Sequence, residues 1–403
     1  MTPCFPLPFP KNPVPIARPR VLFFFVVISA LDTRSQGVGI LDAGSRKTYN
    51  QRSRPPHVDR DSAEDAILED NSQSEVLPDP PWLAFCKLCR LPNLFTAWAD
   101  ILAGFFVVSF YSSERLTGLD FPVELVCLVI ASSLIYSAGM VLNDYYDREI
   151  DAQQRPDRPI PSGAISAPAA LSIAYGMLVA GCLFALLGGY AYVDSAAIPW
   201  RGGVVAVVLS LCVIAYDAVL KRTALAPWIM GSCRFFNILL GMSLAQDLPP
   251  EASWQVFSYD AGQLLFAGGI GLYIVGVTWF ARTEAVASDQ RMLIAGGLLM
   301  LAGIGMLAAL PLVQPSVVTL AQLTPSGLWG ILVLLSLVLA RRAVIAITRL
   351  EPQNVQLTVK QAILSLIFYD AAITLAVCGT IWSVTIVALL LPMLGLRRWM
   401  YST

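Results

Sequence analysis

One short stretch of the sequence, NDYYDREID at 143–151, gathers oxygen-bearing side chains at a regular spacing. It directly follows the apolar run VELVCLVIASSLIYSAGMVL. At about 100° of rotation per residue, a continuous helix would place four of these side chains within an arc of about 100°. They are Asn143, Asp144, Asp147 and Asp151. Like charges so close repel each other, and charge at the end of an apolar segment is costly, so the stretch demands a functional explanation.

A hard divalent cation would relieve that repulsion, so these four side chains are the expected metal ligands. Mg²⁺ is the best match, because it binds one or two carboxylates together with water and substrate phosphate oxygens. Arg155 and Arg158 follow in the sequence and can bind a diphosphate in bidentate fashion. Prolines at 156, 159 and 161 would end the helix and stiffen the loop that carries them. The alternative is an acidic cluster that pairs with its own arginines and only terminates the helix.

Composition excludes several other chemistries. The single histidine, His57, lies in a polar stretch, which rules out a histidine-based nucleophilic triad or histidine metal site within the apolar segments. Cys86 and Cys89 form a lone CxxC with no further zinc ligand nearby, so we interpret them as two unrelated thiols. The formal net charge of −1 gives no basic field for nucleic acid.

The elements that must position the site are transmembrane helices. Hydrophobic residues make up 56% of the 403 residues and charged residues only 14%, which predicts an all-α, polytopic membrane bundle of about nine helices. The predicted helices cover 93–111, 121–142, 166–190, 203–220, 225–245, 260–281, 291–313, 327–348 and 361–391.

The connecting segments differ in charge. Basic residues concentrate in the connections after the second, fourth, sixth and eighth predicted helices, so the positive-inside rule places these connections, the site and the N-terminus in the cytoplasm. With nine helices the C-terminus would lie outside. If the long run at 361–391 were two short helices instead, the C-terminus, with Arg397 and Arg398, would return to the cytoplasmic side.

The first 80 residues differ from the rest and are predicted to be a separate extension, with the membrane domain at 81–403. They contain a basic, proline-rich start, an apolar run of about half the ~20 residues that a span needs, and an acidic linker-like stretch. We interpret this extension as a disordered or targeting segment, or as the product of a mis-assigned start codon.

From about Trp82 onward the chain resembles the UbiA superfamily of intramembrane prenyltransferases. The stretch at 143–151 is similar to that family's first aspartate-rich motif, NDxxDxxxD followed by an RP-containing loop. CRLPNLFTAWADILAGF at 89–105 resembles the family's first helix. YDAVLKRTALAPWIMGSCRFFN at 216–237 resembles the segment after the fourth helix.

The resemblance implies transfer of a prenyl group from an isoprenoid diphosphate to a lipophilic, in particular aromatic, acceptor with Mg²⁺, inside the membrane lipid. The acids and basic groups would stabilise the leaving diphosphate, and an apolar chamber would shield the allylic cation from water. The candidate catalytic residues are Asp147, Asp151, Arg158, Lys221 and Arg282. The candidate substrate-binding residues are Asn93, Asn143, Arg155, Tyr216 and Arg222.

The second aspartate motif of the family is incomplete in this chain. At its place the sequence reads YIVGVTWFARTEAVASDQR, where Val277 occupies the first aspartate position and only Glu284 and Asp289 are acidic. These two acids are the candidate ligands for a second metal ion, although they point about 140° apart on a continuous helix.

The departure leaves three classes of function open. The first is an active prenyltransferase with a modified second site. The second is a non-catalytic UbiA-like protein that binds or transfers a lipid or prenyl product, similar to the EboC type. The third is a transporter whose acids bind a coupling ion, which is disfavoured because transporter sites tend to lie near the membrane midplane.

Overall fold

The computed structural model describes residues 80–111, 123–191, 198–244, 255–282, 289–313 and 323–400. Nearly all of the predicted N-terminal extension therefore lies outside the described residues. The helices are α3 (Pro81–Leu88), η1 (Leu91–Asn93), α4 (Leu94–Tyr111), α5 (Val123–Gln154), α6 (Ala167–Tyr190), α7 (Arg201–Ala215), η2 (Tyr216–Leu220), α8 (Ala226–Gly241), α9 (Ala261–Ala281), α10 (Gln290–Val313), α12 (Pro325–Arg349), α13 (Pro352–Cys378), α14 (Thr380–Ala388) and α15 (Leu390–Met400). A two-stranded antiparallel hairpin, β1 (Gln255–Val256) and β2 (Tyr259–Asp260), precedes α9.

The chain is an integral, multi-pass membrane protein. Within the described ranges, nine helical segments are long and apolar enough to cross a membrane, as the composition predicted. Helix α8, with 16 residues, is shorter than these spans but packs between α7, α4 and α9. Helices α14 and α15 together form the last candidate span, Thr380–Arg398.

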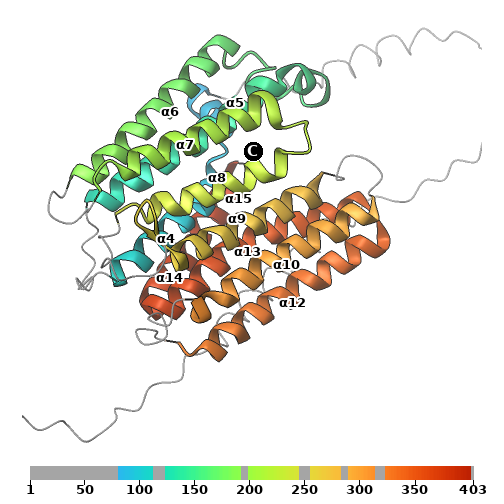
Figure 1. The fold of residues 1–403 in the computed structure, drawn as a ribbon. Helices are drawn as coiled ribbons and strands as arrows, with labels where there is room; N and C mark the ends of the chain where they lie inside the picture. The colour runs from blue at the N-terminus through green and yellow to red at the C-terminus, as the bar shows by residue number, and fades with distance from the viewer. Residues whose placement is uncertain are drawn as a thin grey trace, which may run out of the picture. The chain divides into compact units, whose positions relative to one another are not determined.

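Two groups of helices lie side by side in Figure 1, with α4 and α8 between them. Helices α5, α6 and α7 form one group, and α9, α10, α12 and α13 form the other. Helix α4 contacts α5 on one side and α13 on the other, while α8 contacts α7 and α9. The two central helices therefore connect the groups and share the interior with both.

Helix α5 extends well beyond the end predicted for it at 142. It continues to Gln154 because no helix-breaking residue occurs before Pro156, whose ring disfavours helical geometry at the preceding residue. The aspartates of the 143–151 stretch therefore lie on one continuous helix, as the spacing predicted.

The prediction of a single last helix over 361–391 was wrong. Helix α13 begins at Pro352, before the predicted start, and ends at Cys378. Gly379 follows with a φ of 97°, which favours glycine, and the chain changes direction there. Helix α14 contacts α4, and α15 contacts η1. The C-terminal helices therefore return to the end of the bundle that holds η1, as in the two-helix alternative.

Glycines bring neighbouring helices into backbone contact, as small residues do in membrane bundles. Gly276 of α9 and Gly296 of α10 face each other: a Cβ added at Gly276 would lie 2.5 Å from the backbone nitrogen of Met300 and 2.6 Å from the carbonyl oxygen of Gly296. Gly297, the next residue of α10, would meet nothing within 4 Å. Packing therefore requires glycine at Gly276 and Gly296 but not at Gly297.

We expect Gly276→Ala to destabilise the bundle by about 1–3 kcal/mol, because the added methyl group overlaps backbone atoms that cannot move aside. Gly297→Ala is the matched control and should be neutral or stabilising, since alanine favours a helix over glycine by about 1 kcal/mol. Thermal unfolding of both variants in detergent measures the difference. Equal unfolding temperatures would contradict the close approach of α9 and α10.

Candidate functional site

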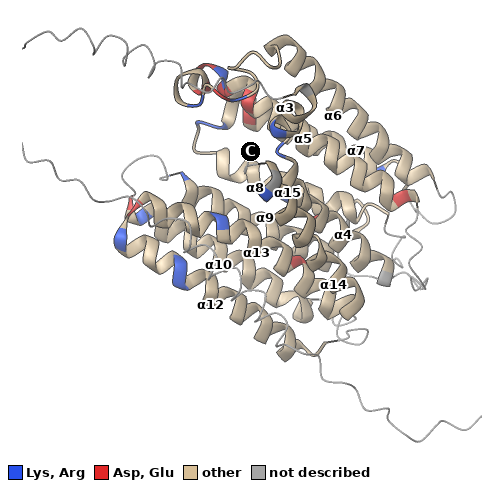
Figure 2. Cartoon of the chain, turned by 180° about the vertical axis from the view of Figure 1, so that it is seen from behind, with Lys and Arg blue, Asp and Glu red and all other residues tan. Residues whose placement is uncertain are grey.

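Most charged residues of the described chain lie toward the ends of the helices (Figure 2). The densest group surrounds the last three turns of α5, where Asp144 and Asp151 are buried with 4% of each residue exposed. Buried carboxylates need partners of opposite charge. Those partners come from two other parts of the chain.

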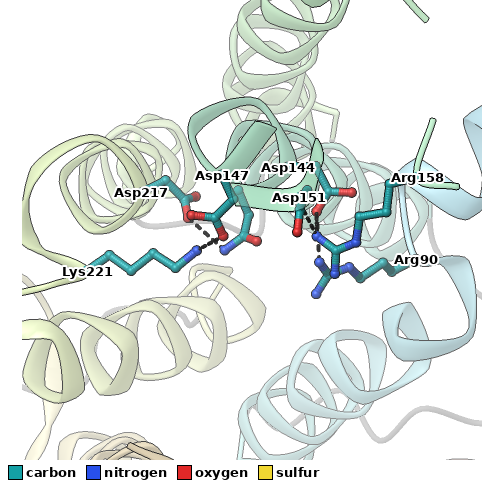
Figure 3. A network of polar contacts seen from close by, with 8 residues as sticks. Arg90, Asp144, Asp147, Asp151, Arg158, Asp217 and Lys221 are labelled. Atoms are coloured by element: carbon teal, nitrogen blue, oxygen red, sulfur yellow. Dashed lines mark hydrogen bonds and ion pairs between the residues drawn. The ribbon is translucent and has the colours of Figure 1, made fainter. Parts of the chain in front are cut away.

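Asp144 and Asp151 share one arginine. Nη1 of Arg158 donates to Oδ1 of Asp144 at 3.1 Å and to Oδ2 of Asp151 at 2.5 Å. Oδ1 of Asp144 also accepts from Nη2 of Arg90 at 2.8 Å. Figure 3 shows the two guanidinium groups converging on the pair of carboxylates.

The backbone aims both arginines at the acids. Arg90 stands between α3 and η1 with a φ of 47°, in the left-handed region that non-glycine residues rarely adopt. Arg158 lies in the turn after α5, where its backbone N–H donates to the carbonyl of Arg155 at 3.1 Å. That turn follows directly from Pro156, which cannot continue the helix.

A second pair of acids lies beside the first. Nζ of Lys221 donates to Oδ2 of Asp147, and Nδ2 of Asn143 donates to Oδ1 of Asp217 at 3.2 Å. Asp217 belongs to the π-helical turn η2, in which the N–H of Lys221 bonds the carbonyl of Tyr216. Such turns in helices often accompany functional sites. Lys221 and Asp217 both point toward α5 (Figure 3).

These groups stand at one end of a cavity of about 500 Å³. Arg90, Asn93, Asn143, Tyr216 and Asp217 contribute polar atoms to its lining. Most of the remaining wall is apolar and comes from α5, α7, α8, α9 and α13. We call the charged group at this end of the cavity the mouth. Arg90, Asn143 and Asp217 line the cavity itself, and beside them lie Asp144, Asp147, Asp151, Arg158 and Lys221 (Figure 3).

Three predicted substrate-binding or catalytic residues have side chains that lie outside the ion pairs of the mouth in the described part of the chain. Arg155 and Arg222 are exposed and are not part of the cavity lining. The guanidinium group of Arg282 donates to the carbonyl of Thr223. Their roles in substrate binding and catalysis remain predictions.

The predicted second metal site has little support in the described residues. Asp289 is exposed, and its Oδ1 accepts from the backbone N–H of Arg291 at 3.0 Å, next to the start of α10. Glu284 lies outside the described residues. Val277, at the place of the missing aspartate, lines the cavity together with Thr278. The α9 wall of the cavity is therefore uncharged where the family pattern has an acid.

Two members of the mouth were missed by sequence reasoning. Arg90 and Asp217 pair with residues 54 and 74 positions away along the chain, so no local spacing reveals them. A signal was present for Asp217, because an acid directly after the apolar run of α7 repeats the arrangement at the end of α5.

The donor set of the mouth fits a hard cation. The described residues contain no group of three or more His, Cys, Asp or Glu side chains placed to hold one ion. The carboxylates instead form pairs, and the pair of Asp144 and Asp151 already has a cationic nitrogen between its oxygens. Mg²⁺ would replace such a nitrogen and would take its remaining oxygens from a phosphate ligand and water.

Cys86 and Cys89 behave as unrelated thiols. Cys89 is 1% exposed, and burial raises the pKa of its thiol to about 12. A thiol with so high a pKa is protonated at neutral pH and is a poor nucleophile there.

The helical bundle, with a charged mouth at one end of an apolar cavity, defines a multi-pass membrane protein with an internal cavity. The UbiA prenyltransferase family model matches residues 101–360, and the chain belongs to this family. The matched range includes α5, its acidic face, η2 and α8.

Two curated relatives are archaeal proteins named digeranylgeranylglyceryl phosphate synthase. The one from Metallosphaera sedula is 34% identical over 141 residues, which cover 35% of this chain and 44% of the relative. The one from Methanothrix thermoacetophila is 43% identical over 103 residues, which cover 26% of this chain and 36% of the relative. The chain thus spans less than half the length of these two relatives.

The same fold occurs in a solved structure from work on digeranylgeranylglyceryl phosphate synthase in membranes. The TM-score is 0.53 at 15% sequence identity, and the match covers 74% of this chain and 99% of the other. At this identity the likeness concerns the fold alone.

Replacement of Arg158 by alanine should lower the free energy of unfolding by about 3 kcal/mol, because two buried carboxylates lose their shared partner. Arg148→Ala is the control: its ion pair with Glu149 is exposed and should be worth less than about 1 kcal/mol. Thermal unfolding in detergent compares the two.

Added Mg²⁺ should then raise the unfolding temperature of Arg158→Ala more than that of the wild-type protein, since the freed carboxylates can take the ion. Equal losses in the two arginine variants, with no extra effect of Mg²⁺, would refute the shared role of Arg158.

Proposed function

We propose that this protein is an intramembrane prenyltransferase that moves an isoprenyl group from an isoprenoid diphosphate to a lipophilic acceptor, with Mg²⁺ as cofactor. The observation that carries the proposal is the charged mouth directly adjoining an apolar cavity. The mouth suits a diphosphate and the cavity suits a hydrocarbon chain. The family of the chain and the names of its relatives support the same activity.

The charges of the mouth explain why a metal ion is needed. Arg90, Arg158 and Lys221 face the four carboxyl groups of Asp144, Asp147, Asp151 and Asp217. A diphosphate adds further negative charge, which three cationic side chains already paired with acids cannot neutralise. The arginines and Lys221 would turn to the phosphate oxygens, and the released carboxylates, with Asn143, would hold Mg²⁺.

Transfer begins when the bond between C1 of the prenyl group and the diphosphate oxygen breaks. The electron pair leaves with the diphosphate, whose charge Arg90, Arg158 and Lys221 stabilise; bound Mg²⁺ would supply further stabilisation of that charge. The allylic cation remains in the cavity, where apolar walls exclude water and the rings of Tyr136 and Tyr216 line the space. The acceptor then forms the new bond to C1 and loses a proton.

A non-catalytic function is the second candidate, and the α9 wall favours it. Val277 and Thr278 line the cavity where a second acidic motif would oppose the first, and Arg282 bonds the carbonyl of Thr223. A protein with one acidic face could bind a prenyl product without forming it.

Purified protein incubated with Mg²⁺, a set of isoprenyl diphosphates and a panel of lipophilic acceptors distinguishes the two. We expect prenylated product and released diphosphate, both measured by mass spectrometry. Binding of an isoprenyl diphosphate without release across the whole panel would favour the non-catalytic protein.

Asp147→Ala should reduce turnover by about 100-fold or more while the protein stays folded in the membrane, because Lys221 loses its partner and the metal loses a ligand. Glu149→Ala is the control, since Glu149 lies on the same helix with its side chain 86% exposed, away from the mouth. Turnover by Asp147→Ala at the wild-type rate would show that this face does not hold the metal.

We also propose that the mouth faces the cytoplasm, because the basic connections lie at that end of the bundle. Arg155 follows α5 at the mouth, whereas Trp200 precedes α7 at the opposite end. Arg155→Cys should react with an impermeant thiol reagent only from the cytoplasmic side and Trp200→Cys only from the other, measured above the labelling of the native cysteines. Labelling of both from one side would exclude this orientation.

A further inference from the structure

A second polar cluster lies inside the bundle, away from the mouth. It consists of Thr96 and Asp100 of α4, Ser132 of α5, Arg234 and Asn237 of α8, and Asp370 of α13. Both aspartates are completely buried. Polar residues at such depth are costly, so they indicate a function.

Arg234 is the centre of this cluster. It donates from Nη1 to Oδ2 of Asp100 and from Nη2 to Oγ1 of Thr96, each at 2.8 Å. Nδ2 of Asn237 donates to the same Asp100 oxygen at 3.0 Å, and Ser132 donates to Oδ1 of Asn237 at 2.7 Å. Asp100 thereby holds both α8 side chains in place.

Asp370 is the second buried acid of the cluster, and no group of the described residues donates a hydrogen bond to its carboxyl oxygens. Both of its carboxyl oxygens, and Oδ1 of Asp100, are buried without a hydrogen-bond partner in the described part of the chain, and the two aspartates are close enough to interact electrostatically. A single proton shared by the two carboxyl groups would remove their mutual repulsion, as in other buried carboxyl pairs. With that proton, one positive charge faces one negative charge and the cluster is neutral.

The cluster forms the inner end of the same cavity. Thr96, Ser132, Arg234 and Asn237 all line it. Ser132 precedes Asn143 by eleven residues on α5, which corresponds to about 16 Å along the helix axis. The cavity therefore has a charged mouth, an apolar middle and a neutral polar inner end.

We propose that the inner end, formed by Thr96, Ser132, Arg234 and Asn237, binds a neutral hydroxyl-bearing group of the acceptor and rejects an anionic one. The inference rests on the proposed prenyl transfer and specifies the acceptor for it. The inner end recognises this group and takes no part in bond making.

Charge is the first reason. The positive charge of Arg234 is already compensated by Asp100, so a carboxylate or phosphate would bring an uncompensated negative charge beside two acids in a medium of low dielectric. A neutral group avoids that cost.

Hydrogen-bonding capacity is the second reason. Ser132 donates to Asn237, and Thr96 donates to the carbonyl of Asn93 while it accepts from Arg234, so each hydroxyl oxygen retains an unused acceptor lone pair. The guanidinium group of Arg234 has five N–H groups and offers donors. A hydroxyl group both donates and accepts, whereas a carboxylate or phosphate oxygen only accepts.

Matched pairs of probes test the inference: hexadecylglycerol against hexadecylglycerol phosphate, and para-hydroxybenzyl alcohol against para-hydroxybenzoate. Binding to the full-length protein is measured with Mg²⁺ and an unreactive isoprenyl thiolodiphosphate present, and turnover is measured in parallel with the reactive diphosphate. We expect the neutral member of at least one pair to bind about tenfold tighter than its anionic partner.

Two variants test whether the net charge of the cluster, rather than its packing, sets the preference for the neutral probe. Asp370→Asn keeps the cluster neutral and should retain the preference. Asp100→Asn combined with Asp370→Asn leaves Arg234 without a counter-charge and should reverse the preference toward the anionic probe. The affinity for the thiolodiphosphate, which binds at the mouth, should stay within about twofold in both and serves as the internal control.

If the double variant does not fold, Asp100→Asn with Arg234→Gln replaces the ion pair by neutral groups, which buried pairs often tolerate. Affinity for the neutral probe should then fall about tenfold, with thiolodiphosphate binding unchanged.

Wild-type protein that prefers the anionic members, or binds none of the four probes, would overturn the inference, as would an unchanged preference in the folded double variant. Preferential binding of the neutral probe without any diphosphate release would refute the proposed transferase activity and leave the inner end as a neutral ligand site.

Discussion

The structure depends on the neutralisation of several carboxyl groups at the end of α5, where an apolar bundle meets charged segments. Asp144 and Asp151 are buried and would repel each other without Arg158 between them. Arg158, in the turn that follows Pro156, and Arg90, with its left-handed backbone conformation, supply this neutralisation. In the proposed function the same cationic groups bind the diphosphate, so stability and ligand binding would depend on the same side chains.

The cavity combines three environments along α5. The mouth carries charges of both signs, the middle is apolar, and the inner end holds a compensated ion pair. Such an order suits two ligands that react where the first two environments meet, because a diphosphate stays at the mouth while hydrocarbon and allylic cation are kept from water. The uncharged α9 wall at Val277 leaves the α5 face as the proposed site for metal and diphosphate in the described part of the chain.

Much of this organisation could be predicted from local sequence. Apolar runs indicated the membrane helices, and the spacing of Asp144, Asp147 and Asp151 indicated one helical face. Long-range pairing could not be predicted, which is why Arg90 and Asp217 were missed: their partners lie on other helices. Gly379 was hidden in an apolar run, and only its left-handed φ reveals that the last helix ends there. Asp100 and Asp370 are isolated acids within apolar segments of the sequence. Their complete burial in the bundle shows that they belong to an internal polar cluster.

The central claim is that the mouth binds a diphosphate and a metal ion together, since either alone leaves charges of one sign unpaired. Titration calorimetry of geranyl thiolodiphosphate with and without Mg²⁺ tests it most directly. Two coupled ligands change each other's affinity by the same factor. Mg²⁺ should therefore strengthen the binding of the analogue, and the analogue should strengthen the binding of Mg²⁺, each by about tenfold or more. An affinity for the analogue that does not change with Mg²⁺ would contradict the account.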